Sequence, residues 1–112
     1  MVSAAHTPSR GDVFLIALDP TLGKEIRKTR PCVVLSPDEL NGHLGTFLVA
    51  PLTTGRHEYP FRVSCRFRRK DGHIVLDQIR AIDRKRLVRH LGRISSPTLS
   101  KVLAVLREMF ED

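Results

Sequence analysis

The hydrophobic residues of this chain fall into short runs separated by turn signals, which is the pattern of a small β-rich protein. Two runs, DVFLIAL and PCVVLS, are almost continuously apolar and predict buried strands. A later run alternates, with Phe61, Val63 and Cys65 between polar neighbours, as in a strand with one solvated face. The predicted strands are residues 12–18, 31–36, 46–52, 61–66, 73–79 and a shorter one at 87–94.

Proline and glycine positions add detail to this pattern. Pro51 interrupts the third strand and indicates an edge or a bulge, because proline cannot donate to a ladder. For the same reason Pro31 is expected to be the first residue of its strand. Asp71-Gly72 is a turn signal that separates the fourth strand from the fifth. The polar residues 19–30 predict a long loop.

The C-terminal residues change to a helical period. Ser96 is suited to cap the helix, with Pro97 at its first position. The apolar face consists of Leu99, Val102, Leu103, Leu106 and Phe110. We therefore expect a mainly β protein, a small SH3-like barrel of five to seven strands with a C-terminal α-helix. Residues 1–112 are expected to form one domain, with a flexible N-terminus at residues 1–9.

Length and composition exclude several classes of protein. The chain has 112 residues, of which 41% are hydrophobic and 28% charged, as in an ordinary globular domain with one small core. No apolar run approaches the roughly 20 residues of a membrane helix, and the N-terminus lacks a signal peptide, so a cytoplasmic location is expected. Cys32 and Cys65 are too few and too far apart for a zinc site, and are expected to be buried thiols.

The positive charge is concentrated in one third of the chain. The whole sequence carries a formal net charge of +7, but residues 62–93 alone hold eleven basic and three acidic residues, which is +8. A solvated charged face is the plain interpretation of a basic run. The concentration of the entire excess in one segment favours a polyanionic partner, with nucleic acid ahead of a membrane surface.

Two segments carry candidate chemistry. The loop at residues 19–30 brings Glu25, Arg30 and other cations together beside a buried strand, where function often lies. A weak surface ion pair of Glu25 explains the same residues equally well. The third strand is followed by Thr53-Thr54-Gly55, which places a hydroxyl at the rim of the predicted barrel.

Other kinds of site are not indicated. The five histidines have no metal-ligand spacing, and the chain has neither a G-x-S-x-G elbow nor a Gly-rich phosphate loop. We therefore expect a site without a metal or another cofactor. His57 and His73 are candidates for acid–base chemistry, although a lone histidine is more often structural.

The order of these motifs resembles the MazF/PemK/Kid family of toxins. The similarity lies in RGDVFLIALDPTLGKEIRKTRPCVVLS at residues 10–36, VAPLTT at 49–54, Tyr59-Pro60-Phe61 and LDQIRAID at 76–83. Each piece is weak alone, but the combination over roughly residues 10–108 is specific.

The resemblance implies a toxin of a toxin–antitoxin module, acting as a homodimeric, metal-independent and sequence-specific endoribonuclease on single-stranded RNA. It also implies inhibition by an acidic antitoxin. The family's catalytic arginine, loop glutamate and rim threonine fall on Arg30, Glu25 and Thr53. Some members use a second arginine where this chain has Val75, which favours a mechanism that relies on the other three residues. The residues expected to contact RNA are Lys28, Arg56, Tyr59, Phe61, Arg68, Arg69, Asp77, Gln78 and Arg80.

Two other interpretations remain at this stage. A gyrase-poisoning toxin of the CcdB type would share the barrel, but such proteins end in a tryptophan-containing segment and this chain has no tryptophan. A non-catalytic RNA-binding barrel would also account for the basic segment.

Overall fold

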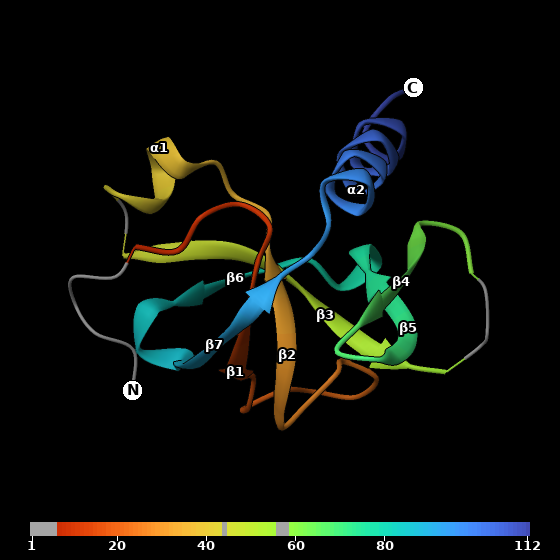
Figure 1. The fold of residues 1–112 in the computed structure, drawn as a ribbon. Coiled ribbons are helices and arrows are strands. Elements are labelled where there is room, and N and C mark those ends of the chain that lie inside the picture. Colours follow the sequence, from red (N-terminus) through yellow and green to blue (C-terminus); the bar gives the residue numbers. More distant parts are fainter. Residues whose placement is uncertain (1–6, 44, 56–58) are drawn as a thin grey trace.

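The computed structural model describes residues 7–43, 45–55 and 59–112 (Figure 1). Their elements are β1 (Asp12–Ala17), β2 (Thr29–Val34), α1 (Asp38–Asn41), β3 (Thr46–Thr54), β4 (Arg62–Phe67), β5 (Lys70–Val75), the 3₁₀ turn η1 (Leu76–Gln78), β6 (Arg80–Asp83), the 3₁₀ turn η2 (Arg84–Arg86), β7 (Leu87–Arg93) and α2 (Ser96–Met109). The prediction of a mainly β protein with a C-terminal helix is confirmed.

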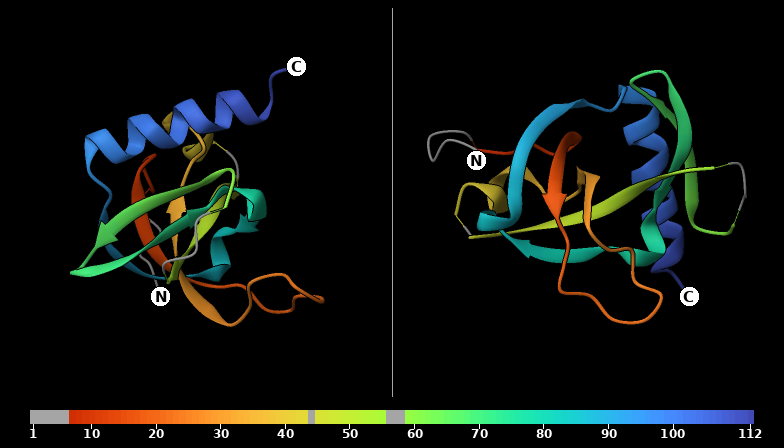
Figure 2. Two further views of the ribbon diagram at one scale, coloured as in Figure 1. Left: turned by 90° about the vertical axis from the view of Figure 1, so that its right-hand side faces the viewer. Right: turned by 90° about the horizontal axis from the view of Figure 1, so that it is seen from below.

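The strands form one antiparallel sheet that curls around a common centre (Figure 2, right). Its order is β4-β5-β3-β2-β1-β7, and β6 pairs with β3. The first half of β3 pairs with β6, and its last residues pair with β5. Within the described residues the ladder is not closed, because β4 and β7 form its two ends. The molecule is therefore an SH3-like barrel that is open along one seam.

The central strands are buried on both faces, which explains their continuous apolar runs. Val13 of β1 and Val33 of β2 pack in one cluster with Val102 of α2. Phe14 and Cys32, the neighbours of these valines in the chain, belong to a second cluster on the other face of the sheet. In Figure 2 (left), α2 lies along one side of the curled sheet and the loop between β1 and β2 projects from the opposite side.

Pro51 lies in the centre of the sheet, so the prediction of an edge strand is wrong. Pro51 is opposite Cys32 of β2, and the pairing of β3 with β2 continues there without a bulge. On the other side of β3, pairing with β6 ends at Val49 and pairing with β5 begins at Leu52. Proline is tolerated because no ladder partner faces it on that side.

The turn between β4 and β5 is Arg68-Arg69, and not Asp71-Gly72 as predicted. Both arginines have positive φ angles, 51° and 65°, in a two-residue hairpin turn that normally favours asparagine and glycine. Gly72 lies inside β5, where an added Cβ would be 1.9 Å from the Thr53 carbonyl oxygen. Glycine is required there for close approach of two strands, so the Asp-Gly pair does not mark a turn.

Two further strand boundaries differ from the prediction. Strand β2 begins at Thr29, so Pro31 is its third residue; pairing with β3 starts only at Cys32, which leaves the proline without a ladder partner on that side. The predicted strand at residues 73–79 ends at Val75, where the chain enters η1. Strand β6 then forms separately and pairs with β3.

Helix α2 begins and ends one residue earlier than its pattern predicted. The N-cap is Ser95, whose Oγ accepts a hydrogen bond from the Thr98 amide at 3.3 Å. Met109 packs against the core, whereas Phe110 lies beyond the last helical residue and is 73% exposed. Among the described residues, no helix is long and apolar enough to cross a membrane.

Both cysteines are free, as predicted, but only Cys32 is fully buried; Cys65 is half-buried. Burial raises the pKa of the Cys32 thiol to about 12, although the nearby charge of Arg80 opposes this effect. Burial also raises the pKa of Cys65. Neither thiol has the low pKa of a reactive cysteine, so both are packing residues.

Candidate active site

Three neighbouring pockets share lining residues along one part of the described surface. We call them the cationic pocket, of about 350 Å³, the carboxylate pocket, of about 210 Å³, and the histidine pocket, of about 370 Å³. Thr53 and Thr54 line both the cationic and the histidine pocket. Ile26 and Gln78 line both the histidine and the carboxylate pocket. The histidine pocket therefore adjoins each of the other two pockets.

The cationic pocket gathers positive charges that are far apart in the sequence. Arg30 comes from β2, Arg68 and Lys70 come from the β4–β5 hairpin, and Arg89 comes from β7; Thr53 lies among them. No described acidic residue lines this pocket. The remaining walls are apolar or backbone-rich and include Leu15, Pro31, Leu52, Phe67 and Leu91. Four cations around a hydroxyl suit an oxyanion such as a phosphodiester.

Two of the four cations of this pocket, Arg30 and Arg68, are held by hydrogen bonds to the main chain. Arg30 is opposite Ile16 in the ladder, and its Nε donates to the Arg27 carbonyl at 3.2 Å. Arg68 donates from Nη2 to the Leu91 carbonyl at 2.5 Å. That bond joins the β4–β5 turn to β7 across the open seam of the barrel. The same contact therefore helps to form the cationic pocket.

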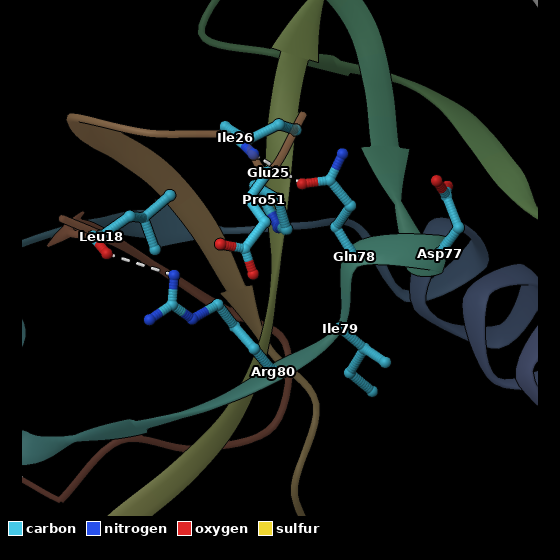
Figure 3. Close-up of a pocket in the computed structure, with 8 residues that line it drawn as sticks. All are labelled: Leu18, Glu25, Ile26, Pro51, Asp77, Gln78, Ile79 and Arg80. Carbon is cyan, nitrogen blue, oxygen red and sulfur yellow. Dashed lines mark hydrogen bonds between the residues drawn. The ribbon is translucent and has the colours of Figure 1, made fainter. Parts of the chain in front are cut away.

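The carboxylate pocket lies beneath the loop between β1 and β2 (Figure 3). The Glu25 carboxylate points into it and accepts a hydrogen bond from the Leu22 amide at 2.5 Å. Gln78 accepts from the Ile26 amide at 2.6 Å and donates to the Lys24 carbonyl at 3.5 Å. Gln78 therefore holds the main chain on both sides of Glu25.

The ends of this loop are also fixed. Asp19 accepts hydrogen bonds from the Lys28 amide at 3.1 Å and from the Thr21 hydroxyl at 3.0 Å. Arg80 donates to the Leu18 carbonyl at 3.1 Å. Arg86 donates to the Asp19 carbonyl at 2.5 Å. The loop is thus tied to the barrel at its base, and Glu25 is presented from an ordered segment.

The histidine pocket is lined by Tyr59, Arg62, His73 and the residues that it shares with its neighbours. Arg62 donates to both carboxylate oxygens of Asp77, at 2.9 and 3.1 Å. This hydrogen bonding lowers the pKa of Asp77, against a smaller opposing effect of burial, and raises the pKa of Arg62. Asp77 is therefore a paired, ionised carboxylate at neutral pH.

The comparison with protein families decides what kind of protein this is. The family described as PemK-like, MazF-like toxin of type II toxin–antitoxin system matches residues 9–110. The chain belongs to this family.

Individual relatives agree with that assignment to the PemK/MazF-like toxins. The endoribonuclease toxin MazF of Escherichia coli K12 is 39% identical over 77 residues, which cover 69% of each chain. The endoribonuclease MazF of Staphylococcus epidermidis is 35% identical over 99 residues, covering 83% of this chain and 82% of the relative. The crystal structure of MazF from Deinococcus radiodurans superimposes with a TM-score of 0.82 at 28% identity, covering 93% and 96% of the two chains.

The predicted site residues of this PemK/MazF-like toxin are distributed over the three pockets. Arg30 and Thr53 share the cationic pocket, whereas Glu25 lines the carboxylate pocket. Of the predicted RNA-contacting residues, Arg68 lines the cationic pocket and Tyr59 lines the histidine pocket. Asp77 and Arg80 line the carboxylate pocket, and Gln78 lines both the carboxylate and the histidine pocket. Lys28, Phe61 and Arg69 line none of the three. Arg56 and His57 lie outside the described residues.

The sequence pattern does not distinguish several of the residues that line the cationic pocket. Lys70 and Arg89 were only members of the basic run, and nothing in their spacing tells them apart from Arg93, which instead pairs with Asp12 at 2.7 Å. Leu87, Arg89 and Leu91 are spaced two residues apart, which places them on one face of a regular strand, so their spacing gives no signal that Arg89 lines a pocket. Within the described part of the chain, no three His, Cys, Asp or Glu side chains gather as a metal site.

Proposed function

We propose that this PemK/MazF-like chain is the toxin of a type II toxin–antitoxin module and cleaves single-stranded RNA at specific sequences as an endoribonuclease. The observation that carries the proposal is the cationic pocket, which surrounds the Thr53 hydroxyl with four positive charges in a chain whose named relatives are endoribonucleases. A polyanion held by cations next to a hydrogen-bond donor is the arrangement that phosphodiester chemistry needs.

The proposed reaction uses the 2′-hydroxyl of the RNA as nucleophile. The 2′-oxygen attacks the adjacent phosphorus, its proton goes to a base, and the 5′-oxygen leaves with a proton from an acid. Arg30 is proposed to neutralise the phosphorane with its planar fork, and Thr53 to donate a hydrogen bond to a phosphate oxygen. Arg30 is unsuited to supply the proton, because an arginine pKa normally exceeds about 12.

Glu25 is the carboxylate that best suits the role of base. Glu25 and Asp77 both line the carboxylate pocket, but Asp77 is already paired with Arg62 through two hydrogen bonds. Glu25 accepts one amide hydrogen bond, from Leu22, and its side chain is exposed. A 2′-hydroxyl can therefore approach Glu25 without displacing a cation from it.

The variant Glu25→Gln is expected to cleave RNA at least about 100-fold more slowly, because it removes a general base and keeps the shape of the side chain. RNA affinity should stay close to that of the wild type, measured by anisotropy with an uncleavable oligonucleotide. Glu108→Gln, an exposed change on α2, is the control. Unchanged turnover would transfer the base role to a histidine, and His57 would be tested first.

Arg68 and Arg69 are proposed to hold the RNA backbone. The double variant Arg68→Asn, Arg69→Gly removes two charges and the bond from Arg68 to the Leu91 carbonyl. It gives the β4–β5 turn the residues that its positive φ angles favour, so the turn should be retained. The slope of log affinity against log salt should flatten by about 0.7 for each phosphate that the variant no longer neutralises. The cleavage motif should be unchanged, because phosphate contacts position the strand without reading it. A changed motif would place these arginines at base edges.

The partners follow from the same surface. The MazE–MazF complex of Deinococcus radiodurans contains a MazF that matches 93% of this chain at 25% identity, with a TM-score of 0.75. This supports an antitoxin partner, and we propose an acidic segment that competes with RNA for the cationic pocket. We also propose that the toxin is a homodimer and acts in the cytoplasm, where its RNA substrate is found.

The proposed function is tested by incubating the purified chain with single-stranded RNA and sequencing the new 5′ ends. Cleavage at a defined motif, abolished in the Arg30→Ala variant, is the expected result. RNA binding without cleavage would favour the non-catalytic barrel, and gyrase inhibition without either would favour a CcdB-type toxin. Family membership and the named relatives favour neither of these alternatives.

A further inference from the structure

His73 is a mostly buried polar side chain on the wall of the histidine pocket. Its exposed fraction is 6%, and it lines the histidine pocket. Among the described residues, its side chain makes no hydrogen bond or ion pair. No fully buried side-chain nitrogen or oxygen atom there lacks a hydrogen-bond partner, so the ring nitrogens of His73 remain accessible to solvent. In the ladder His73 is opposite Thr53 of β3 and Ser64 of β4, so its ring is on the face of the sheet that carries Thr53.

A mostly buried imidazole whose ring nitrogens remain accessible at a pocket is placed to bind a ligand. A neutral imidazole presents one donor and one acceptor in a plane. The edge of a nucleobase presents the complementary groups, also in a plane.

The same pocket contains a planar group that is already oriented for stacking. The Arg62 guanidinium is fixed by its two hydrogen bonds to Asp77 and lies 4.7 Å from the centre of the Tyr59 ring. Arginine planes and tyrosine rings are surfaces on which unstacked bases of single-stranded RNA are held. The arrangement is therefore in place before RNA binds and does not have to be ordered by it.

The position of the pocket connects it with the reaction. Thr53 and Thr54 line both this pocket and the cationic pocket, so a nucleotide whose phosphate lies beside Thr53 has its base within reach of His73. We propose that the histidine pocket is a nucleobase subsite, in which His73 reads the edge of one base next to the cleaved phosphate and Arg62 stacks on it. The inference rests on the proposed endoribonuclease activity and assigns one position of its sequence specificity to His73.

The test is a cleavage assay on single-stranded RNA with randomised sequence, followed by sequencing of the ends. The wild type, His73→Leu, His73→Gln and the surface control His43→Gln are compared. Leucine removes both polar groups, whereas glutamine restores a donor and an acceptor with different spacing. In His73→Leu, the preference for one base over the others should fall at least tenfold at one position of the cleavage motif. The preferences at the other positions should be unchanged. His73→Gln should change the preferred base at that same position, and the control should match the wild type.

A second measurement uses the wild type and does not depend on the folding of a variant. Histidine ring signals are followed by NMR while an oligonucleotide of the preferred motif, made uncleavable by one 2′-deoxy substitution, is added. The His73 signals should shift, and an abasic site at the position identified above should abolish that shift.

The possible outcomes separate the two proposals. No cleavage by the wild type would contradict the endoribonuclease function itself. Cleavage with unchanged preferences in both His73 variants, or His73 signals that ignore the RNA, would overturn the subsite alone. His73 signals that respond to an acidic antitoxin peptide but not to RNA would also overturn it and would assign the pocket to the inhibitor.

Discussion

Replacing Arg30 by alanine is expected to reduce the rate of RNA cleavage by at least about 100-fold, the usual cost of removing one charged or hydrogen-bonding group that stabilises a transition state. Arg30 is exposed in the cationic pocket and belongs to neither buried cluster, so the fold should be preserved. The effect should appear mainly in the catalytic rate, because Arg68, Lys70 and Arg89 still hold the phosphate backbone. Single-turnover cleavage of an oligonucleotide, with circular dichroism of the same sample, measures both quantities.

The matched control is Arg107→Ala, which removes the same charge from an exposed position on α2. It should cleave RNA at the wild-type rate. If Arg30→Ala retains cleavage within about tenfold of the wild type, Arg30 does not stabilise the phosphorane, and another cation of the pocket must do so. Arg89 would then be the next candidate, because it enters the same pocket from β7.

Substituting a single 2′-deoxynucleotide on the 5′ side of the scissile bond is expected to abolish cleavage of the oligonucleotide. The 2′-hydroxyl is the proposed nucleophile, and no step of the reaction proceeds without it. Binding should decrease little, because most of the affinity comes from backbone phosphates. Cleavage of the unmodified oligonucleotide should leave a 2′,3′-cyclic phosphate and a 5′-hydroxyl, which mass spectrometry distinguishes from other ends.

The control places the deoxynucleotide one position away, where it should leave the rate unchanged. A metal chelator should also have no effect on the unmodified substrate, because the proposed reaction uses side chains and the RNA alone. A 5′-phosphate product, or cleavage of the deoxy substrate, would identify an activated water as the nucleophile. The roles proposed for Glu25, Arg30 and Thr53 would then be wrong.

The strands were predictable where a local pattern reports burial. Strand β1 and the body of β2 follow from continuous apolar runs, because both faces of these strands are covered. Helix α2 follows from its 3.6-residue period. The errors arose where long-range packing overrides local preference. Gly72 resembles a turn residue but serves the close approach of β5 to β3, while the real turn carries two arginines at positive φ.

The candidate site was predictable only residue by residue. The motif resemblance drew attention to Glu25, Arg30 and Thr53, and the structure places the last two in one pocket. It places Glu25 in another, because the loop is held over β1 and β6 by Asp19, Gln78 and Arg80. No spacing along the chain encodes that separation.

The sequence by itself determined the family, the kinds of secondary structure and the sign of the charge that the protein presents. These properties depend on residues that are close together in the chain, or on composition. Only the tertiary structure decided which cations act together, because Arg30, Arg68 and Arg89 converge from three separate strands or turns, while Arg62 and Arg93 pair with carboxylates. Only the structure likewise shows that His73 is mostly buried and lines the histidine pocket, since burial is set by neighbours that lie far away in the sequence.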